Sequence, residues 1–458
     1  MSQTRASLLT FGSRGDVQPF VAIGLALQRQ GYHVTLCAPK DQEGFVRHHG
    51  IHHFVPLHFT TEEIMKKFAP CMRDPSKACM ESIIAGYYSE DFPQTKNVVM
   101  KVCKESDIVL YHCCLESEVL CATEHFKVPA IGATVFPFMV TSQYFPPVLD
   151  EDMFPAGTPC SLVWETVLKG GWTQARANAI NKWRRELGLS PVDHPLGIHG
   201  LAEGKEGLNH RFITMWSGHI LPRAADWGEN VLEGGFCFLE EDAKGKKSAE
   251  QERVEEFLTK GEKPVYFGFG SVQHPNPDTL VQAILNVIDR LKLRAIIYEG
   301  AGSLPRPIDL DLTKFGTDRV LWAKEVPHSW LFPQCRAVVI HGGIGTVATA
   351  LKAAVPPIIC PIGMDQPFWA HRLAEKGLGP KKIVNALRVN AEELLASMKE
   401  VFSDEEKEQS EEGQMEGGSI IRERVQAVAK LLAAENGVAK VVAVVQQLAP
   451  SPLETREA

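Results

Sequence analysis

The sequence predicts an α/β protein made of two doubly wound domains. The chain has 458 residues, more than one ordinary hydrophobic core accommodates. Short apolar segments alternate with stretches whose apolar residues recur at helical spacing, the pattern of parallel sheets with crossover helices. A glycine-containing turn follows the first strand of each half, at Gly12–Asp16 and Gly268–Ser271. We therefore expect two similar folds that face a cleft.

The first half begins as a strand, a turn and a helix. Ala6–Phe11 is apolar, and Phe20, Ile23 and Leu27 then recur at helical spacing up to Gly31. Further strands are expected at His33–Ala38, Ile51–Leu57, Ile108–Tyr111 and Ala130–Thr134. The N-terminal domain is assigned to residues 1–232, and the charged stretch 233–262 is assigned to a linker.

The second half repeats the pattern over residues 263–417. Its expected strands are Pro264–Phe269, Ala295–Tyr298, Val320–Trp322, Ala337–Ile340 and Ile358–Pro361. Residues 418–458 are assigned to a C-terminal helical segment and tail, which is expected to cross back toward the first domain. Both sheets then have parallel strands, whose carboxyl ends are the usual place for a ligand.

Composition narrows the function classes. The formal charge of −8 argues against a nucleic-acid partner, which would favour a basic face. The 11 cysteines show no CxxC spacing, which favours a reducing compartment. No stretch reaches the roughly 18 apolar residues of a spanning helix, and the N-terminus lacks a signal-peptide pattern. We expect a cytoplasmic protein, with peripheral membrane contact left open and no oligomeric state predicted.

Residues 341–366 carry the most specific signal. A buried strand is followed by His341, by Gly343 and Gly345, and by Thr346 at the start of a helix-compatible stretch. This arrangement presents backbone N–H groups to an anion at a helix N-terminus. Asp365 and Gln366 follow the next apolar run and suit sugar hydroxyls. The segment therefore predicts a nucleotide-sugar site.

Asp16 and Ser271 lie in the two glycine turns. The Gly12–Asp16 turn is not the GxGxxG of a dinucleotide fingerprint. Asp16 is interpreted either as a helix cap or as a general base, and Ser271 either as part of an ordinary tight turn or as a phosphate donor.

Aromatic residues mark two further stretches. Trp164, Trp172 and Trp183 recur along residues 161–187, which favours two helices packed on a core, with the lining of an acceptor pocket as the alternative. The candidate acceptor-pocket residues are Phe136, Met139, Tyr144 and Trp164.

The chain resembles the GT-B glycosyltransferases that use UDP-sugars, and within them the sterol glucosyltransferases and related antibiotic-modifying enzymes. The resemblance spans about Ser7 to Gly379. Besides the motifs above, it rests on the segments Trp216–Trp227, with Leu221-Pro-Arg and Ala225-Asp-Trp, Val326–Phe332, Asp365–Trp369, Asn181–Arg184 and Leu187–Leu189.

The resemblance implies roles for these residues. His341, Thr346 and Ser271 would hold the diphosphate with backbone help from Gly343 and Gly345, and Asp365 and Gln366 would bind the transferred sugar. The segment that contains Trp322 and Val326 would frame the uracil. Asp16 stands where many plant relatives carry a histidine base, so it would deprotonate the acceptor.

The expected reaction is an inverting, metal-independent transfer of a hexose, with UDP-glucose as donor substrate and no cofactor. A lipophilic alcohol such as a sterol is the expected acceptor. Three alternatives stay open: a flavonoid, polyketide or other small-molecule acceptor, a UDP-sugar epimerase, and a non-catalytic UDP-sugar binder. Two patterns are judged not to be metal sites, namely the Asp309-Leu-Asp311 string and the group His48, His49, His52 and His53.

Overall fold

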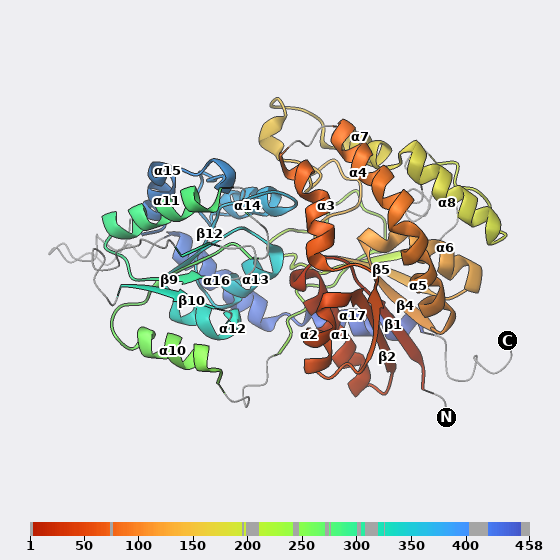
Figure 1. Cartoon of the computed structure of the whole chain (residues 1–458), viewed down its shortest axis with the longest axis horizontal. Coiled ribbons are helices and arrows are strands. Elements are labelled where there is room, and N and C mark those ends of the chain that lie inside the picture. Colours follow the sequence, from red (N-terminus) through yellow and green to blue (C-terminus); the bar gives the residue numbers. More distant parts are fainter. Residues whose placement is uncertain are drawn as a thin grey trace. The chain divides into compact units, whose positions relative to one another are not determined.

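The computed structural model describes residues 3–73, 77–194, 197, 210–240, 247–270, 274, 276–299, 304–306, 319–324, 326–402 and 420–449. By the contacts between residues the chain divides into two compact units (Figure 1). The first unit comprises Met1–Glu240 together with Glu435–Ala458, and the second comprises Glu241–Ala434. The predicted linker, residues 233–262, is shared between these units.

A seven-stranded sheet forms the centre of the first unit. Its strand order is β3-β2-β1-β4-β5-β6-β7, and every neighbouring pair is parallel. The strands are β1 (Arg5–Leu9), β2 (His33–Pro39), β3 (His53–Leu57), β4 (Ile108–His112), β5 (Ala130–Thr134), β6 (Arg211–Thr214) and β7 (Val231–Glu233). Because the strands are parallel, the segments that follow β1, β4 and β5 leave the sheet at one edge.

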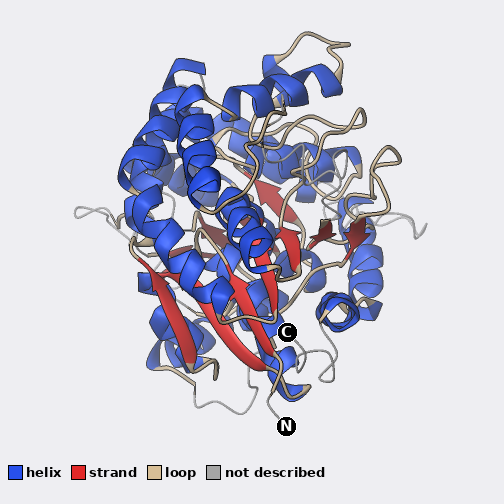
Figure 2. Ribbon diagram, turned by 90° about the vertical axis from the view of Figure 1, so that its right-hand side faces the viewer, coloured by secondary structure: helices blue, strands red, loops and turns tan. Residues whose placement is uncertain are grey.

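Helices connect and enclose these strands (Figure 2). The helices of the first unit are α1 (Arg14–Arg29), α2 (Glu43–His48), α3 (Thr61–Arg73), α4 (Lys77–Glu90), α5 (Phe92–Lys104), α6 (Glu116–Phe126), α7 (Cys160–Gly171), α8 (Gln174–Glu186) and α17 (Gly437–Leu448). Helix α1 shows why the sequence forms them: Phe20, Ile23 and Leu27 are fully buried at helical spacing, and Gly31 follows in the left-handed region at φ 87°.

The second unit is built in the same way around five parallel strands in the order β10-β9-β8-β11-β12. These strands are β8 (Val265–Gly268), β9 (Ala295–Tyr298), β10 (Val320–Ala323), β11 (Ala337–Ile340) and β12 (Pro357–Ile359). Its helices are α10 (Ala249–Leu258), α11 (Pro277–Arg290), α12 (His328–Leu331), α13 (Ile344–Lys352), α14 (Gln366–Glu375), α15 (Ala391–Phe402) and α16 (Ile420–Ala434). The α/β class with two parallel sheets is confirmed.

The C-terminal part of the chain returns to the first unit, as predicted. Helix α16 packs against α13 in the second unit, whereas α17 packs against α1 (Figure 1). The buried residues Val441, Val442 and Val445 form the apolar face of α17. In the described part of the chain, no helix is both long and apolar enough to cross a membrane.

Candidate functional site

Asp16 lies in the first turn of α1, directly after the turn that follows β1. Its Oδ2 accepts hydrogen bonds from the backbone N–H of Ser13 at 2.7 Å and from the Ser13 hydroxyl at 3.2 Å. Gly12 permits this arrangement, because its φ is 113° and a Cβ at this position would lie 2.3 Å from Asp16 Oδ2. Asp16 is therefore the third residue of a capping box whose N-cap is Ser13, a role related to the helix-cap interpretation, and its Oδ1 is left for other contacts.

His112 is a titratable neighbour of Asp16. It is the last residue of β4, which pairs with β1, and its side chain is buried. Its Nε2 lies 3.8 Å from Asp16 Oδ1, and its Nδ1 accepts a hydrogen bond from the backbone N–H of Cys114 at 3.3 Å. A nitrogen that accepts is unprotonated, so the proton of the neutral ring is on Nε2, toward Asp16.

His112 is not among the site residues predicted from the sequence. A signal was available, because a histidine directly follows the predicted strand Ile108–Tyr111 and the carboxyl ends of neighbouring parallel strands meet at one edge.

The surroundings of Asp16 alter its acidity. Removal from water raises the pKa of Asp16 above its usual value, His112 lowers it, the Cys114 side chain raises it, and the hydrogen bonds from Ser13 lower it. The net direction is upward. A carboxylate with a raised pKa is a stronger base than an exposed one, which suits the removal of a proton from an alcohol.

The segment that follows β5 approaches the same pair of residues. The ring of Phe136 makes an edge contact with the His112 ring, with 6.2 Å between the ring centroids. Phe136 is half-buried, whereas the other candidate acceptor residues, Met139, Tyr144 and Trp164, are buried. The Trp164 indole donates a hydrogen bond to the Tyr144 carbonyl at 2.9 Å, so Trp164 supports this segment from α7.

In the second unit, His341 directly follows β11 and lies against the turn after β8. A Cβ on Gly270, whose φ is 66°, would lie 2.7 Å from His341 Cε1, so the two segments meet at van der Waals distance only because this residue is glycine. Ser271, the predicted phosphate donor of this turn, lies outside the described residues.

Burial lowers the pKa of His341 to about 4, and a hydrogen bond to the Gly268 backbone opposes this effect. The imidazole is therefore neutral at pH 7. Its Nδ1 is buried without a hydrogen-bond partner among the residues that the structure describes. A buried ring nitrogen of this kind can serve an anionic ligand.

Helix α13 begins three residues after His341, at Ile344. Gly343 is its N-cap, and the Gly343 carbonyl accepts hydrogen bonds from the backbone N–H groups of Thr346 and Val347. Gly345 is exposed and Thr346 is half-buried, so both are accessible in the first turn. The first N–H groups of a helix have no intrahelical carbonyl, and the helix dipole places partial positive charge there.

Asp365 and Gln366 follow β12 at the start of α14, but their side chains have different surroundings. Asp365 Oδ2 accepts a hydrogen bond from the Trp369 indole at 2.9 Å, which fixes the carboxylate. Gln366 is buried, and its Oε1 accepts hydrogen bonds from the backbone N–H groups of Ile362 and Gly363. Its carbonyl oxygen therefore holds the preceding turn, and only its amide nitrogen is left for a ligand.

The two residues predicted to frame the base are both buried. Trp322 lies on β10 and is 4% exposed, and Val326, three residues after that strand, is 6% exposed. Neither side chain presents an open stacking surface, so contact with a base would use the backbone of this segment.

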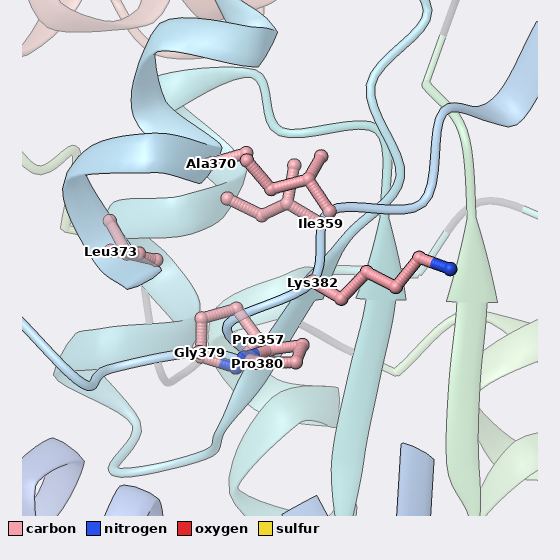
Figure 3. Close-up of a pocket in the computed structure, with 8 residues that line it drawn as sticks. Pro357, Ile359, Ala370, Leu373, Gly379, Pro380 and Lys382 are labelled. Carbon is pink, nitrogen blue, oxygen red and sulfur yellow. The ribbon is translucent and has the colours of Figure 1, made fainter. Parts of the chain in front are cut away.

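A small cavity lies beside β12 and α14 in the second unit (Figure 3). Its lining includes Pro357, Ile359, Ala370, Leu373 and Lys382. Its volume of about 10 Å³ is on the scale of one water molecule, so it is too small for a sugar.

Two sequence patterns were considered as metal sites, the Asp309-Leu-Asp311 string and the histidines at 48, 49, 52 and 53, and the structure describes only the second. Asp309 and Asp311 lie outside the described residues. Among the described residues, His48, His49, His52 and His53 form no cluster with the geometry of metal ligands. Instead, His33 and His53 pack ring to ring at 4.2 Å, and the ring of His49 bonds to the Phe45 carbonyl.

Comparison with known families divides the chain in the same way as its fold. Residues 7–143 match the glycosyltransferase family 28 N-terminal domain. Residues 311–434 match the C-terminal domain of the erythromycin biosynthesis protein CIII-like family. The first match contains Asp16 and His112, and the second contains His341, Asp365 and Gln366.

Several curated relatives are sterol 3-beta-glucosyltransferases. Two from Arabidopsis thaliana are 32% identical over 403 residues and 30% identical over 460 residues, covering 82% and 96% of this chain. One from Pichia angusta is 29% identical over 418 residues, or 87% of this chain. The chain spans 57%, 67% and 31% of the lengths of these three relatives.

Solved structures support the fold. The glycosyltransferase of kitacinnamycin matches with a TM-score of 0.67 at 19% identity, covering 98% of this chain and 100% of that chain. The calicheamicin glycosyltransferase CalG4 matches with a TM-score of 0.64 at 15% identity, covering 98% of each chain. The family matches, the identity to the second Arabidopsis relative and these folds agree: the chain belongs to the GT-B glycosyltransferases, the family that includes sterol 3-beta-glucosyltransferases and antibiotic glycosyltransferases.

Proposed function

We propose that the chain transfers a hexose, glucose in the first instance, from a UDP-sugar to the hydroxyl of a lipophilic acceptor, with a sterol as the leading candidate. The observation that carries the proposal is the half-buried carboxylate of Asp16 beside the buried His112, at the sheet edge that the aromatic segment after β5 also reaches. The names of the sterol glucosyltransferase relatives support the choice of acceptor.

The second unit would supply the donor half of the chemistry. The N–H groups at the start of α13, the Thr346 hydroxyl and the buried His341 nitrogen would bind the diphosphate. Asp365, fixed by Trp369, would accept hydrogen bonds from sugar hydroxyls. Negative charge grows on the diphosphate as it leaves, and these groups would stabilise it where it develops. We propose that this happens without a metal ion or a cofactor.

Asp16 would supply the acceptor half. Its Oδ1 would take the proton of the acceptor hydroxyl while that oxygen forms a bond to the anomeric carbon of the sugar. The bond from this carbon to the diphosphate oxygen breaks on the opposite face, so the configuration inverts. UDP leaves with the electron pair of that bond, and the proton remains on Asp16 until solvent removes it.

The position of His112 predicts a pH effect. Asp16 acts as a base only when it is ionised, so activity is lost as the pH falls through the Asp16 pKa. His112 lowers this pKa, and a His112→Leu variant should therefore lose activity at a higher pH than the wild type. We expect kcat at pH 8 to fall roughly tenfold as well, because the carboxylate loses its partner. The measurement is the pH profile of kcat/KM.

A His112→Gln variant separates the electrostatic effect from simple packing. The glutamine amide can still donate toward Asp16, so its profile should lie between those of the wild type and the leucine variant. Identical acid limbs in all three proteins would remove His112 from the proposed mechanism.

The function itself is tested by incubating the protein with UDP-glucose and separate panels of sterols, fatty alcohols, flavonoids and polyketides. We expect a steryl β-glucoside and UDP, measured by mass spectrometry and NMR. A glycoside from another panel alone would replace the sterol acceptor. Epimerised UDP-sugar without any glycoside would indicate the epimerase alternative, and UDP-glucose binding with no product would indicate a non-catalytic binder.

A further inference from the structure

The segment Trp216–Trp227 has no part in the mechanism above, although it carries conspicuous motifs, Leu221-Pro-Arg and Ala225-Asp-Trp. It connects β6 to β7 in the first unit. Three of its side chains, those of Arg223, Asp226 and Trp227, make hydrogen bonds to other segments of the first unit.

Arg223 fixes the shape of the segment itself. Its guanidinium donates hydrogen bonds to the backbone carbonyls of Val231 at 3.0 Å, Ala224 at 3.3 Å and Trp227 at 2.6 Å, and also to that of Gly228. The planar guanidinium carries several donors in a fixed geometry, so one side chain can set several carbonyl positions at once. Asp226 and Trp227 are thereby presented from a rigid turn.

Asp226 uses this position to hold the segment that follows β5. Its Oδ1 accepts a hydrogen bond from the Thr141 hydroxyl at 2.7 Å. Its Oδ2 accepts two from Ser142, from the backbone N–H at 2.7 Å and from the hydroxyl at 2.9 Å. Partial burial acts to raise the pKa of Asp226, but these hydrogen bonds outweigh it and keep the pKa below the usual value.

Trp227 holds the same segment through a second set of contacts. Its indole donates a hydrogen bond to the Val140 carbonyl at 3.1 Å, and its ring makes an edge contact with Tyr144 at 5.8 Å. On its other side the ring meets Trp216 at 6.3 Å, and the Trp216 indole bonds to the Leu221 carbonyl. Residues 140–144 are therefore held in place by hydrogen bonds to the Asp226 carboxylate and by the hydrogen bond and ring contact of Trp227.

Residues 140–144 follow the part of the chain that contacts His112, the neighbour of the proposed base. Phe136 contacts His112, and His112 faces Asp16. The Phe136 and Phe138 rings, both half-buried, make an edge contact at 6.3 Å. A loop that is already ordered loses little conformational entropy when a ligand binds, and this favours affinity.

We propose that Asp226 and Trp227 are positioning residues for the acceptor: they hold residues 136–144 in the conformation that receives an apolar alcohol beside Asp16. The inference rests on the proposed function and deepens it, because it assigns the acceptor wall to this loop and its rigidity to the Ala225-Asp-Trp motif. It concerns acceptor binding alone, and binding of the UDP-sugar is independent of it.

The test compares Asp226→Ala with a matched control, Asp107→Ala. Asp107 also accepts three hydrogen bonds, from Arg5 N, Nε and Nη2, and it directly precedes β4, at the opposite edge of the same sheet. In Asp226→Ala we expect the acceptor KM to rise roughly tenfold, with kcat and the donor KM nearly unchanged. Asp226→Asn should fall between the alanine variant and the wild type, because the amide keeps one accepting oxygen. Asp107→Ala should leave the acceptor KM as in the wild type.

Two results would overturn the inference: an unchanged acceptor KM in Asp226→Ala, or an equal rise in both alanine variants. If the wild type transfers sugar to no acceptor, the proposed function fails instead. Backbone hydrogen exchange then tests separately whether Asp226 holds the loop of residues 136–144. Faster exchange confined to residues 139–144 in Asp226→Ala, and absent in Asp107→Ala, supports it, and unchanged exchange overturns it.

Discussion

Asp16→Asn should lower kcat for sugar transfer about a thousandfold while leaving UDP affinity unchanged. Asparagine has the same shape, and its carbonyl oxygen can still accept the Ser13 N–H that caps α1. It cannot accept the acceptor proton, so the loss isolates base catalysis. UDP affinity should persist because the diphosphate is proposed to bind at α13, in the other unit.

The stability of this variant should change little. The carboxylate favours the positive end of the α1 dipole, a gain of typically 0.3–1 kcal/mol, but its raised pKa shows that burial of the charge costs free energy in the opposite direction. Thermal unfolding should therefore match that of the wild type within a few degrees.

Asp107→Asn is the control, since Asp107 belongs to the same sheet and has no proposed role in catalysis. A wild-type transfer rate in Asp16→Asn, measured with saturating UDP-glucose and acceptor, would show that Asp16 is a helix cap and no more.

The fold was largely predictable because its strands are apolar runs bounded by turns. Ten of the twelve strands in the described part of the chain coincide with predicted segments to within a few residues. The two exceptions, β6 and β7, each contain only two apolar residues beside polar or charged ones, so neither forms an apolar run in the sequence. They join the sheet through pairing with β5 and with each other, and such long-range pairing leaves no local signal.

Site residues could be predicted only where the backbone conformation requires particular residue types, such as glycine, that are visible in the sequence. The turns around Gly12 and Gly343 need small residues and appear as motifs, so Asp16, His341 and Thr346 could be named as candidates. His112 and Asp226 act through side-chain contacts across the fold, His112 with Asp16 and Asp226 with Thr141 and Ser142, and one sequence does not encode such pairs visibly.

Burial could not be read from the sequence either. Met139, Tyr144 and Trp164 are apolar or aromatic as a pocket requires, but the structure buries all three residues. Gln366 was expected to face sugar hydroxyls, and its carbonyl oxygen holds a turn instead. The roles of these residues in ligand binding stay predictions.

The second large effect concerns the donor. His341→Ala should weaken UDP binding about tenfold, measured by calorimetry, and should lower kcat by a further factor of about 100. The effect on kcat is expected to exceed the effect on UDP binding because the diphosphate gains negative charge as the sugar leaves. A hydrogen-bond donor therefore contributes more in the transition state than in the ground state. Because the pKa of His341 is about 4, the ring acts as a neutral donor at pH 7.

Because the His341 ring is expected to stay neutral, its role in donor binding can also be tested by the pH dependence of affinity. Affinity of the wild type for UDP-glucose, whose diphosphate has no terminal phosphate to titrate, should vary little between about pH 6.5 and 8, a range in which a histidine with an ordinary pKa of about 6.5 would begin to gain charge. His341→Gln, which retains an amide donor, should recover part of the affinity, and substitution of the exposed His53 in the first unit should change nothing. Wild-type UDP affinity in His341→Ala would remove this residue from the diphosphate site and leave the N–H groups of α13 as the remaining candidates, because these backbone donors do not depend on the imidazole.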